Sequence, residues 1–334
     1  MALAHSNIAL AKYWGKRDAE LNLPDVPSLS MTLAALSTRT RVQFDPSLEA
    51  DQIVLNGSVA DASTTKKVSA VLDRVRGAAA IASRARVESM NDFPTASGLA
   101  SSASGFAALA LASSAAAGLD WSSARLSGLA RASSVSAARS IFGGFAYIEA
   151  GAISAAPLDV SPLARDLAMV IAVTDAGPKP VGSTSAMLHT QATSPYYQGF
   201  RDRAPAIYEE VRAALLSGDL ARLGDAMEHS ALAMHAAMLA ARPSLIYWNP
   251  ATLAVIHGVR ELRARGTFAH FTIDAGPHVK VLCQTGDAAR IRSVLAELPG
   301  VQRVIVSGPG AAARLLPSHE FVAPAPSQGS RGAS

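Results

Sequence analysis

The sequence predicts an α+β fold, on three observations. Predicted strands and helices do not alternate one by one along the chain, which argues against a doubly wound parallel sheet. The length of 334 residues favours two domains, or one large α/β domain, at roughly 100 to 200 residues per domain. Hydrophobic residues make up 49% of the chain and charged residues 17%, so most of the chain can bury a core and is not disordered.

Alternating and β-branched residues predict the strands, and capped segments with a helical period predict the helices. The predicted strands span residues 38–44, 52–55, 85–89, 145–149, 168–173, 269–273, 279–283 and 301–306. The predicted helices span residues 64–79, 101–117, 121–131, 205–216, 220–241, 250–265 and 287–297. Residues 174–194, rich in Gly, Pro, Ser and Thr, form either a linker or an active-site loop, and we expect the tail, 317–334, to be disordered.

The composition excludes several classes of protein. Cys283 is the single cysteine and no Cys/His pair has zinc-ligand spacing, which excludes a secreted disulfide scaffold. The most apolar run, residues 105–119, is shorter than the roughly 18 residues that a membrane span needs, and no signal peptide is recognisable. The net charge of +4 comes from scattered basic residues, which favours small anionic ligands over nucleic acid or a membrane. We therefore expect a cytoplasmic protein.

A Gly- and Ser-rich stretch, PTASGLASSASG at residues 94–105, runs directly into an Ala-rich predicted helix. Small residues let backbone N–H groups approach an anion, and the helix N-terminus adds partial positive charge. The stretch is typical of a phosphate cradle, although it lacks the Gly-Lys-Ser/Thr of a Walker A loop. A flexible turn that caps a close-packed helix is an equally good interpretation.

The segment NIALAKYWGKRD, residues 7–18, places Lys12 and Lys16 on either side of Tyr13 and Trp14. In a strand both lysines would share one face, and lysine binds phosphate as a point charge. By itself, the commoner interpretation is an amphipathic surface stretch with both lysines in water.

The segment ASSVSAARSIFGG, residues 132–144, contains an arginine among small and hydroxyl residues. If it is helical, Ser136 and Arg139 share a face and the hydroxyls of Ser133 and Ser134 lie near its start. The guanidinium fork suits a carboxylate or a phosphate. A capped helix with an ordinary surface arginine is the alternative.

In FTIDAGP, residues 271–277, Asp274 ends a predicted strand just before a turn. Its carboxylate is either a general base or hydroxyl-orienting group, or, more commonly, a turn residue bonded to its own loop. No histidine belongs to a triad motif. His235, within an apolar helical pattern, is predicted to be a satisfied core residue.

Together and in this order, these segments resemble the diphosphomevalonate decarboxylases of the GHMP small-molecule kinase superfamily. The resemblance spans nearly the whole chain and includes SLSMTL, SAARSIFGGF, TSPYYQ and MHA as well as the segments above. It implies a two-domain GHMP-kinase-like fold with the active-site cleft between a ribosomal-S5-like N-terminal domain, residues 1–168, and a ferredoxin-like C-terminal domain, residues 169–316.

The resemblance also implies an activity: ATP-dependent conversion of mevalonate 5-diphosphate to isopentenyl diphosphate, with release of ADP, phosphate and CO₂, in isoprenoid biosynthesis. ATP and Mg²⁺ would be the cofactors and a phosphorylated small molecule the substrate. Relatives suggest a homodimer.

Residue roles follow from the same resemblance. Asp274 would contact the tertiary hydroxyl of the substrate, Arg139 would clamp its carboxylate, and Lys12 would lie close to the reacting centre. The residues expected on the phosphate side of the substrate are Tyr13, Lys16, Ser134, Ser136 and Ser183. The expected ATP phosphate loop is Gly98, Leu99, Ala100, Ser101, Ser102, Ala103 and Ser104, of which Ser101 and Ser102 would contact phosphate or magnesium.

Three departures from the family pattern concern the substrate and the first strand. Val135 replaces a family glycine, a position where φ > 0 would favour glycine. Either a small backbone shift leaves the diphosphate held, or a shortened pocket prefers a monophosphate. PDVPS, residues 24–28, replaces a stretch with central Asn and Ser, and the chain begins just before Asn7, which implies a short edge strand or a misassigned start.

Other functions compete with this one. Within the superfamily, the alternatives are decarboxylation of the monophosphate, or phosphorylation of a mevalonate-like hydroxyl without decarboxylation. A non-catalytic nucleotide-binding sensor belongs to a different class, and the joint presence of Lys16, Arg139 and Asp274 argues against it.

Overall fold

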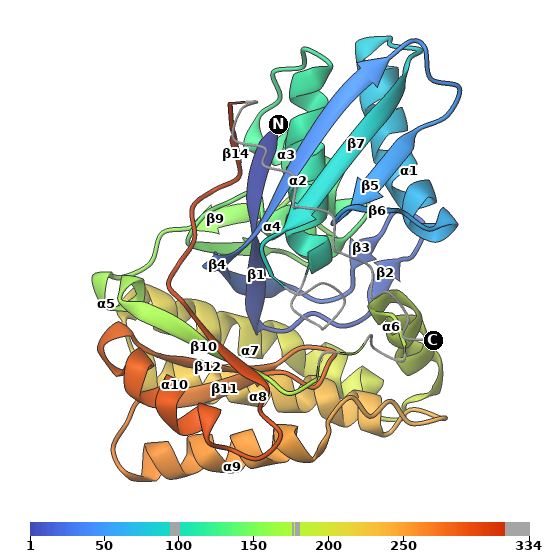
Figure 1. Ribbon diagram of the computed structural model, residues 1–334. Helices are drawn as coiled ribbons and strands as arrows, with labels where there is room; N and C mark the ends of the chain where they lie inside the picture. Colours follow the sequence, from blue (N-terminus) through green and yellow to red (C-terminus); the bar gives the residue numbers. More distant parts are fainter. Residues whose placement is uncertain (94–100, 176, 178–180, 318–334) are drawn as a thin grey trace, which may run out of the picture.

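The computed structural model describes residues 1–93, 101–175, 177 and 181–317 of the chain (Figure 1). They form an eight-stranded sheet, a four-stranded antiparallel sheet and a short two-stranded pair. In Figure 1 the first large sheet occupies the upper half and the second the lower half, each with its own helices. The predicted α+β class is confirmed.

The first sheet has the strand order β14-β1-β4-β7-β5-β6, with β8 attached to β4 and β9 to β8. Its strands are β1 (Ala2–Ala11), β4 (Ser28–Asp45), β5 (Gln52–Leu55), β6 (Ser58–Val59), β7 (Arg84–Asn91), β8 (Phe145–Ile148), β9 (Ala156–Leu158) and β14 (Arg314–Leu315). The strands β2 (Lys16–Asp18) and β3 (Leu23–Pro24) form the separate pair. The helices of this half are α1 (Ala62–Ala79), α2 (Ser101–Ala116), α3 (Ser123–Arg131) and α4 (Val135–Arg139).

Two helices of this half differ in character, and the difference follows from their sequences. Asp61 caps the start of α1, where its carboxylate accepts the N–H of Thr64, and the helix buries one stripe of valines and a leucine. The helix α2 is rich in Ala and Ser and apolar on most sides, so it packs closely against β1 and β4 at the centre of the core. The N-terminus of α2 is thereby fixed beside the strands that carry the candidate site.

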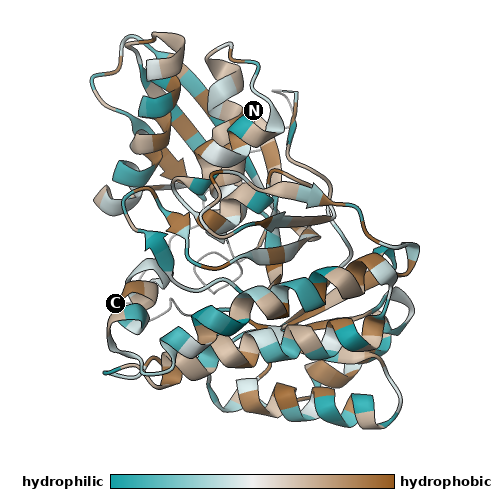
Figure 2. Ribbon diagram, turned by 180° about the vertical axis from the view of Figure 1, so that it is seen from behind, coloured by the Kyte–Doolittle hydropathy of each residue, from teal (hydrophilic) through white to brown (hydrophobic). Residues whose placement is uncertain are grey.

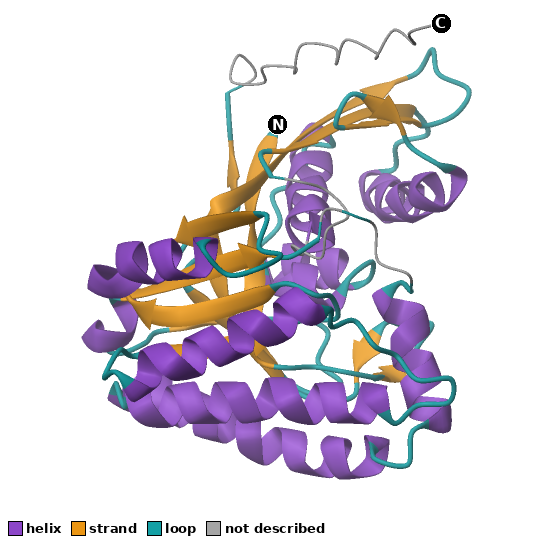
Figure 3. Cartoon of the chain, turned by 60° about the horizontal axis from the view of Figure 1, so that its bottom comes forward, coloured by secondary structure: helices purple, strands orange, loops and turns teal. Residues whose placement is uncertain are grey.

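The second sheet has the order β11-β12-β10-β13 and is antiparallel throughout. Its strands are β10 (Leu167–Val173), β11 (Ala269–Ile273), β12 (Val279–Gln284) and β13 (Arg303–Ser307). The helices of this half are α5 (Pro162–Arg165), α6 (Ser183–Thr193), α7 (Tyr197–Ser217), α8 (Leu220–Leu239), α9 (Pro250–Ala264), α10 (Ala288–Ala296) and the 3₁₀ turn η1 (Thr285–Asp287). Figure 3 shows the long helices lying side by side against this sheet.

Both faces of the second sheet are buried. The alternate residues Val170, Phe271 and Val281 face the helices α9 and α10. The opposite face, with Met169 and Leu282, packs on α7 and α8 and on residues of β1 and β4, which joins the two halves in one core. The helices of this half carry hydrophilic and hydrophobic residues on different sides, as expected when one face is buried (Figure 2).

After β13 the chain returns to the first sheet, where β14 pairs with β1. The returning segment passes close to β4, and a Cβ on Gly310 would lie 2.9 Å from the backbone nitrogen of Ala34. A Cβ on Gly143 would lie 2.5 Å from the backbone nitrogen of Ala312. Glycine is required at both positions because two backbones meet there.

Each predicted strand and helix corresponds to an observed one, but several elements differ. Of the two alternatives considered for the first strand, the short edge strand is wrong, because β1 has ten residues and pairs with β4 on one side and β14 on the other. The segment 174–194 is neither wholly linker nor wholly loop, since it contains α6. The helix α7 begins at Tyr197 rather than at the predicted Pro205, which lies inside the helix. Residues 318–334 of the expected disordered tail lie outside the described residues.

Candidate active site

A cavity of about 380 Å³ lies between the two halves of the chain. The first half contributes, among others, Asn7, Lys12, Tyr13, Lys16, Lys67, Ser101, Ser102, Ser134, Val135, Ser136 and Arg139. The second half contributes Ser183, Thr184, Met187, Met234, Asp274 and Ala275. The structure thus brings the three predicted catalytic residues and the five predicted substrate-binding residues to one cavity.

Asp274 follows the last residue of β11, and its carboxylate lies between two lysines. Oδ1 is 2.5 Å from Nζ of Lys12, and Oδ2 is 3.0 Å from Nζ of Lys280. Burial opposes ionisation of Asp274, but the two ammonium groups outweigh it and hold the pKa of this carboxyl well below its usual range. Among the described residues the carboxylate forms its ion pairs with these two lysines, whereas the backbone oxygen of Asp274 accepts the N–H of Gly276 in the turn.

Lys12 comes directly after β1 and is almost completely buried. Burial lowers the pKa of its ammonium to about 8; Asp274 raises it and Lys280 lowers it further. Its backbone N–H donates to Oγ of Ser230 on α8, which fixes the end of β1 against the second half. The interpretation of Lys12 and Lys16 as neighbours on one strand face is wrong, because β1 ends at Ala11 and β2 begins at Lys16.

Arg139 ends the short helix α4 and is 2% exposed. Its Nε donates to Oγ of Ser30 at 2.8 Å and its Nη1 to Oγ of Ser28 at 2.5 Å, both on β4. Its Nη2 lies 3.4 Å from Oδ1 of Asn7. Burial lowers the pKa of Arg139 to about 10, which still leaves the guanidinium charged at neutral pH. The ordinary surface arginine considered for this position is excluded.

Lys16 is buried at the start of β2, and its Nζ donates to Oδ1 of Asn22. Burial, followed by the charge of Arg131, lowers the pKa of Lys16 to about 8. The amide of Gln191, on α6, exchanges two hydrogen bonds with the backbone of Lys16, at 2.8 and 3.0 Å. The helix α6, which the sequence did not predict, therefore holds this lysine in place.

The helix α4 is confirmed, with Ser134 as its N-cap residue, although Ser134 makes no side-chain capping bond. The hydroxyls of Ser134 and Ser136 lie 3.0 Å apart at the cavity. Val135 occupies the first helical position, and the non-glycine residues with positive φ in the described chain do not include it. The backbone at this position is therefore helical rather than of the φ > 0 type that favours glycine, and the side chain packs against Ala138 and Ile148.

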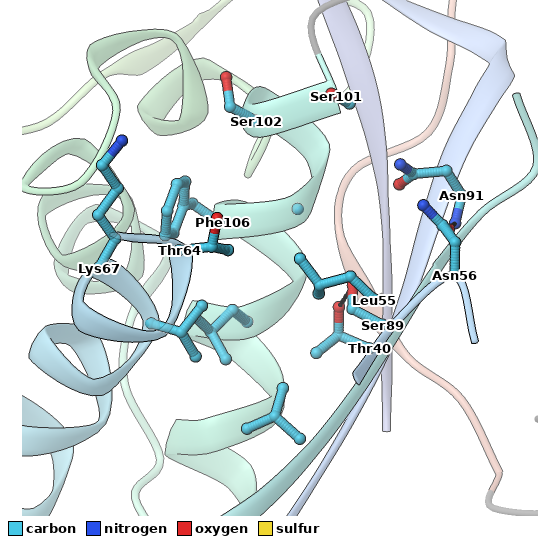
Figure 4. Close-up of a pocket in the computed structure, with 14 residues that line it drawn as sticks. Thr40, Leu55, Asn56, Thr64, Lys67, Ser89, Asn91, Ser101, Ser102 and Phe106 are labelled. Atoms are coloured by element: carbon cyan, nitrogen blue, oxygen red, sulfur yellow. Dashed lines mark hydrogen bonds between the residues drawn. The ribbon is translucent and has the colours of Figure 1, made fainter. Parts of the chain in front are cut away.

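A second cavity, of about 270 Å³, adjoins the first and shares Lys67, Ser101, Ser102 and Phe106 with it (Figure 4). Its other lining residues are both apolar and polar: Leu55, Val68, Val87 and Leu109 beside Thr40, Asn56, Thr64, Ser89, Asn91 and Gly105. In Figure 4 the two serines stand at the start of α2, and Lys67 faces them from α1. The arrangement suits a ligand with an uncharged part that is both apolar and hydrogen-bonding in the second cavity and with phosphates that reach the first.

The expected ATP phosphate loop is only partly described. Ser101 and Ser102 line both cavities from the first turn of α2. Ala103 and Ser104 are buried, and Oγ of Ser104 lies 2.6 Å from Oγ1 of Thr38 in the sheet, so these two side chains line neither cavity. The remaining predicted positions, Gly98, Leu99 and Ala100, lie outside the described residues.

Sequence reasoning missed four residues of this region: Asn7, Asn22, Lys67 and Lys280. Asn7 opens the NIALAKYWGKRD segment, but an amide within a strand gave no separate signal. Lys67 was one of two adjacent lysines on a predicted helix, and helical phase alone does not show which ligand it faces. Lys280 is a single charge in an apolar strand, VKVLC, which was a usable signal because such charges are rarely buried without a partner.

His235, on α8, lies beside the same site and is buried against Trp248, with ring centroids 4.8 Å apart. Burial, followed by the charge of Lys12, lowers the pKa of His235 to about 3, so the ring is neutral at physiological pH. The prediction of a core position is confirmed, but the prediction that its hydrogen bonds are satisfied is wrong for Nε2, which has no partner among the described residues.

In the described chain, no helix has the length and apolar character needed to cross a membrane. The same residues contain no group of three or more His, Cys, Asp and Glu side chains that could hold a metal ion.

Comparison with known proteins identifies both halves. Residues 4–156 match the model of the diphosphomevalonate decarboxylase-like N-terminal domain, and residues 169–308 match that of the mevalonate 5-diphosphate decarboxylase C-terminal domain. The phosphomevalonate decarboxylase of Haloferax volcanii is 32% identical, over 96% of this chain and 98% of that protein. The diphosphomevalonate decarboxylase of Candida albicans is 33% identical, over 91% of this chain and 94% of that protein.

Solved structures agree. Mevalonate diphosphate decarboxylase from Staphylococcus aureus is 39% identical with a TM-score of 0.90, covering 95% of this chain and 97% of that one. A complex of MDDEF with MVAPP, AMPPCP and magnesium is 41% identical with a TM-score of 0.89, covering 94% of this chain and 98% of that one. By sequence, by both domain models and by fold, the chain belongs to the diphosphomevalonate decarboxylase family.

Proposed function

We propose that this chain catalyses the ATP-dependent decarboxylation of mevalonate 5-diphosphate to isopentenyl diphosphate, with release of ADP, phosphate and CO₂. One observation carries the proposal. The buried guanidinium of Arg139 contacts only neutral groups in the described chain and takes part in none of its ion pairs, yet it lines the same cavity as the Lys12–Asp274 pair. A buried charge without a counter-ion is costly, so the cavity is suited to a ligand that brings a carboxylate.

The first chemical step uses the carboxylate of Asp274. The oxygen of the substrate's tertiary hydroxyl attacks the γ-phosphorus of ATP, its proton passes to Asp274, and ADP leaves. Because its pKa is held low, Asp274 is ionised at neutral pH and is available to orient the hydroxyl. Lys12, 2.5 Å from Oδ1, fixes the carboxylate and adds positive charge where phosphoryl oxygens would lie.

The second step breaks two bonds. A tertiary alcohol is a poor leaving group, and its phosphate ester is a good one. The C–O bond breaks with its electron pair on phosphate, and the pair released as CO₂ departs from the neighbouring carbon forms the alkene. Arg139, held by Ser28, Ser30 and Asn7, would orient the carboxylate until CO₂ leaves. No electron-sink cofactor is required.

The nucleotide fits the two adjoining cavities, with the base in the second, where apolar side chains and the amides of Asn56 and Asn91 line the wall. The first turn of α2 offers backbone N–H groups and the hydroxyls of Ser101 and Ser102, and Lys67 offers a cation on the opposite side. Mg²⁺ prefers oxygen ligands and is commonly held by nucleotide phosphates with few protein groups. The two serine hydroxyls fit that requirement, and magnesium would neutralise charge on the phosphates. AMPPCP and magnesium in the MDDEF complex support this assignment.

Two findings favour a second candidate substrate, mevalonate 5-phosphate. Val135 stands where relatives have glycine and lines the cavity, and a relative of this chain is named phosphomevalonate decarboxylase. Against it, Lys16, Ser134 and Ser136 provide a cation and two hydroxyls at the end where the diphosphate would bind. We therefore place the diphosphate first.

The resemblance to the family also supports a homodimer that acts in the cytoplasm. Light scattering during gel filtration tests the first point, since a dimer has twice the chain mass of 34.4 kDa. Cell fractionation of the native host tests the second.

The deciding experiment incubates the protein with MgATP and either mevalonate 5-diphosphate or 5-phosphate, and follows ADP and CO₂ in the same samples. Stoichiometric ADP and CO₂ from the diphosphate supports the proposal. ADP without CO₂ would make the chain a kinase, release of neither would make it a binding protein, and a preference for the monophosphate above about tenfold, 1.4 kcal/mol in the transition state, would replace the substrate.

A further inference from the structure

Lys280 is a charged side chain at a position that the strand pattern assigns to the core. It lies within β12 and is 0% exposed. Its neighbours Val279 and Val281 face α9 and α10, so Lys280 points to the opposite face, where Leu282 joins the core between the two halves. A buried ammonium group costs stability unless it is paired, so a lysine here needs an explanation beyond packing.

The ammonium of Lys280 is directed at Asp274. Its Nζ lies 3.0 Å from Oδ2 of Asp274 and donates to the backbone oxygen of His278 at 3.3 Å. Sheet register explains the meeting: Lys280 is opposite Thr272 on β11, and Asp274 lies two residues beyond Thr272. Lys280 does not line the cavity, so it meets the carboxylate from behind while Lys12 meets it from the cavity side.

Each lysine forms an ion pair with a different oxygen of the carboxylate: Lys12 with Oδ1 and Lys280 with Oδ2. An ion pair at each oxygen opposes rotation of the carboxylate about its terminal bond, so the two lysines together favour one orientation toward the cavity. The other charged or titratable groups that act on Asp274 and Lys12 are Arg139, from α4, and His235, from α8. His235 is neutral at physiological pH, so Arg139 and Lys280 are the cations that act on this pair from outside it.

We propose that Lys280 is a positioning residue for the reaction: it orients the Asp274 carboxylate toward the substrate hydroxyl and sets the electrostatic field of the Lys12–Asp274 pair. The effect of Lys280 on the reaction rate, its kinetic part, rests on the proposed function. The effect of its charge on Lys12 and Asp274, its electrostatic part, concerns the protein without substrate. A lysine with only a packing role in the sheet would have neither effect.

The electrostatic part has a direct test, because the chain contains only six lysines. Lysine labelled with ¹³C at Cε gives few NMR signals, and the Lys12 signal is assigned as the one lost in Lys12→Arg. Lys280→Met keeps the volume and removes the charge. Removing a nearby like charge favours the charged form of Lys12, so its pKa, about 8 in the native chain, should rise by about one pH unit.

The kinetic part is tested on the same variants. Lys280→Met should lower kcat by about 10- to 100-fold, since the loss of an oriented base affects turnover, and leave KM for ATP within about threefold. Without the positive charge, the pKa of Asp274 rises, so the acid limb of the kcat profile should move to higher pH. Lys280→Arg retains the charge and should recover part of kcat and the native position of that limb.

Controls separate this role from general damage to the sheet. Leu282→Met changes the same face of the same strand without changing charge, and should alter neither the Lys12 pKa nor the pH profile. Thermal melting and the dispersion of the NMR spectrum establish that each variant is folded, and Lys280→Gln is the second charge-removing variant if Lys280→Met does not fold.

An unchanged Lys12 pKa together with a native kcat profile in a folded Lys280→Met or Lys280→Gln variant would overturn the proposal. A native chain that releases no CO₂ would instead overturn the proposed function. In that case the NMR titration still decides the electrostatic part.

Discussion

The carboxylate of Asp274 lies 2.5 Å from the ammonium of Lys12, although 262 residues separate them in the chain. Lys12 follows the end of β1 in the first sheet, and Asp274 follows the end of β11 in the second. The ion pair therefore forms only when the two halves are packed against each other. These two side chains of the candidate site are brought together by the same interface that forms the joint core.

Asp274→Asn should nearly abolish turnover. The change keeps the shape but removes the charge that orients the hydroxyl and accepts its proton, and such groups contribute about 10² to 10⁴ in rate. Nucleotide affinity should stay within a few-fold, because Asp274 does not line the second cavity. Single-turnover ADP formation measures the effect. Asp287→Asn, at the opposite end of the second sheet, is the control, and a native rate in Asp274→Asn would show that Asp274 is only a turn residue.

Arg139→Ala should cost roughly 2 to 5 kcal/mol in kcat/KM, because the substrate carboxylate would be left unpaired in a buried site. Arg139→Lys should recover little of it, since a point charge cannot replace three donors directed at Ser28, Ser30 and Asn7. Steady-state kinetics of CO₂ release measure both variants. Arg165→Lys, in an exposed pair with Asp159, is the control. Full activity in Arg139→Lys would contradict the carboxylate clamp.

Substitutions of the α2 serines should have different effects, because the side chain of Ser102 lines the cavities and that of Ser104 points into the core. Ser102→Ala should raise KM for MgATP more than KM for the mevalonate substrate, because its hydroxyl lies at the nucleotide cavity. Ser104→Ala is the matched control: it should lower the free energy of unfolding by about 1 kcal/mol, through lost bonds to Thr38 and Ser6, without changing KM for ATP. The reverse ranking of the two KM values in Ser102→Ala would move this helix end to the substrate side.

Val135→Gly tests whether valine, in place of the glycine of the family pattern, changes the preference between the diphosphate and the monophosphate substrate. Because Val135 has a helical backbone and packs against Ala138 and Ile148, we expect the native chain to prefer the diphosphate and the variant to change that preference by less than about tenfold. The ratio of kcat/KM for the two substrates is the measurement, with Val135→Ala as the intermediate. A much larger change on restoring glycine would mean that the valine side chain selects the substrate.

Substrate binding should weaken above pH 8. Burial, helped by Arg131, lowers the pKa of Lys16 to about 8, so Lys16 is charged below that pH and loses its charge as the pH rises through it. KM for the substrate should then rise by up to about tenfold per pH unit. In Lys16→Arg, whose guanidinium stays charged, that rise should shrink even if KM is higher throughout. Parallel profiles from pH 7 to 9.5 would assign the effect to another group.

Much of this architecture could be predicted because it depends on local pattern. The strands 52–55 and 269–273 were predicted with the observed bounds, since β-branched and apolar residues are flanked by clear turn signals. The first strand, β1, was missed because Ala, Ser, His and Asn give little β signal, and it is stabilised by its neighbours β4 and β14 rather than by propensity. The helix α6 was missed because Gly and Pro precede it and its Ser and Thr residues are weak helix formers.

The site could be predicted only through the resemblance to the family. Composition and spacing could not show whether Lys12, Lys16 and Arg139 lie on the surface or are buried. Burial of these side chains depends on which elements of the fold pack over them. Lys280 has no motif around it, and only the register of β11 with β12 shows that it meets Asp274. Contacts made across sheets and across the two halves are decided by tertiary structure.

The return of the chain to the first sheet has a mechanical consequence. The two connections between the halves leave the second sheet through β10 and β13, which are adjacent strands with Met169 opposite Ser307. Both connections therefore lie at one end of that sheet, whereas Asp274 lies at the other end, about 20 Å away along the strands. At that distance, a rotation of about 3° between the halves would displace Asp274 by about 1 Å, a distance that matters for a near-attack geometry. The position of the Asp274 carboxylate therefore depends on the core shared by the two halves and on the bond from the Lys12 backbone to Ser230, and not only on the chain connections.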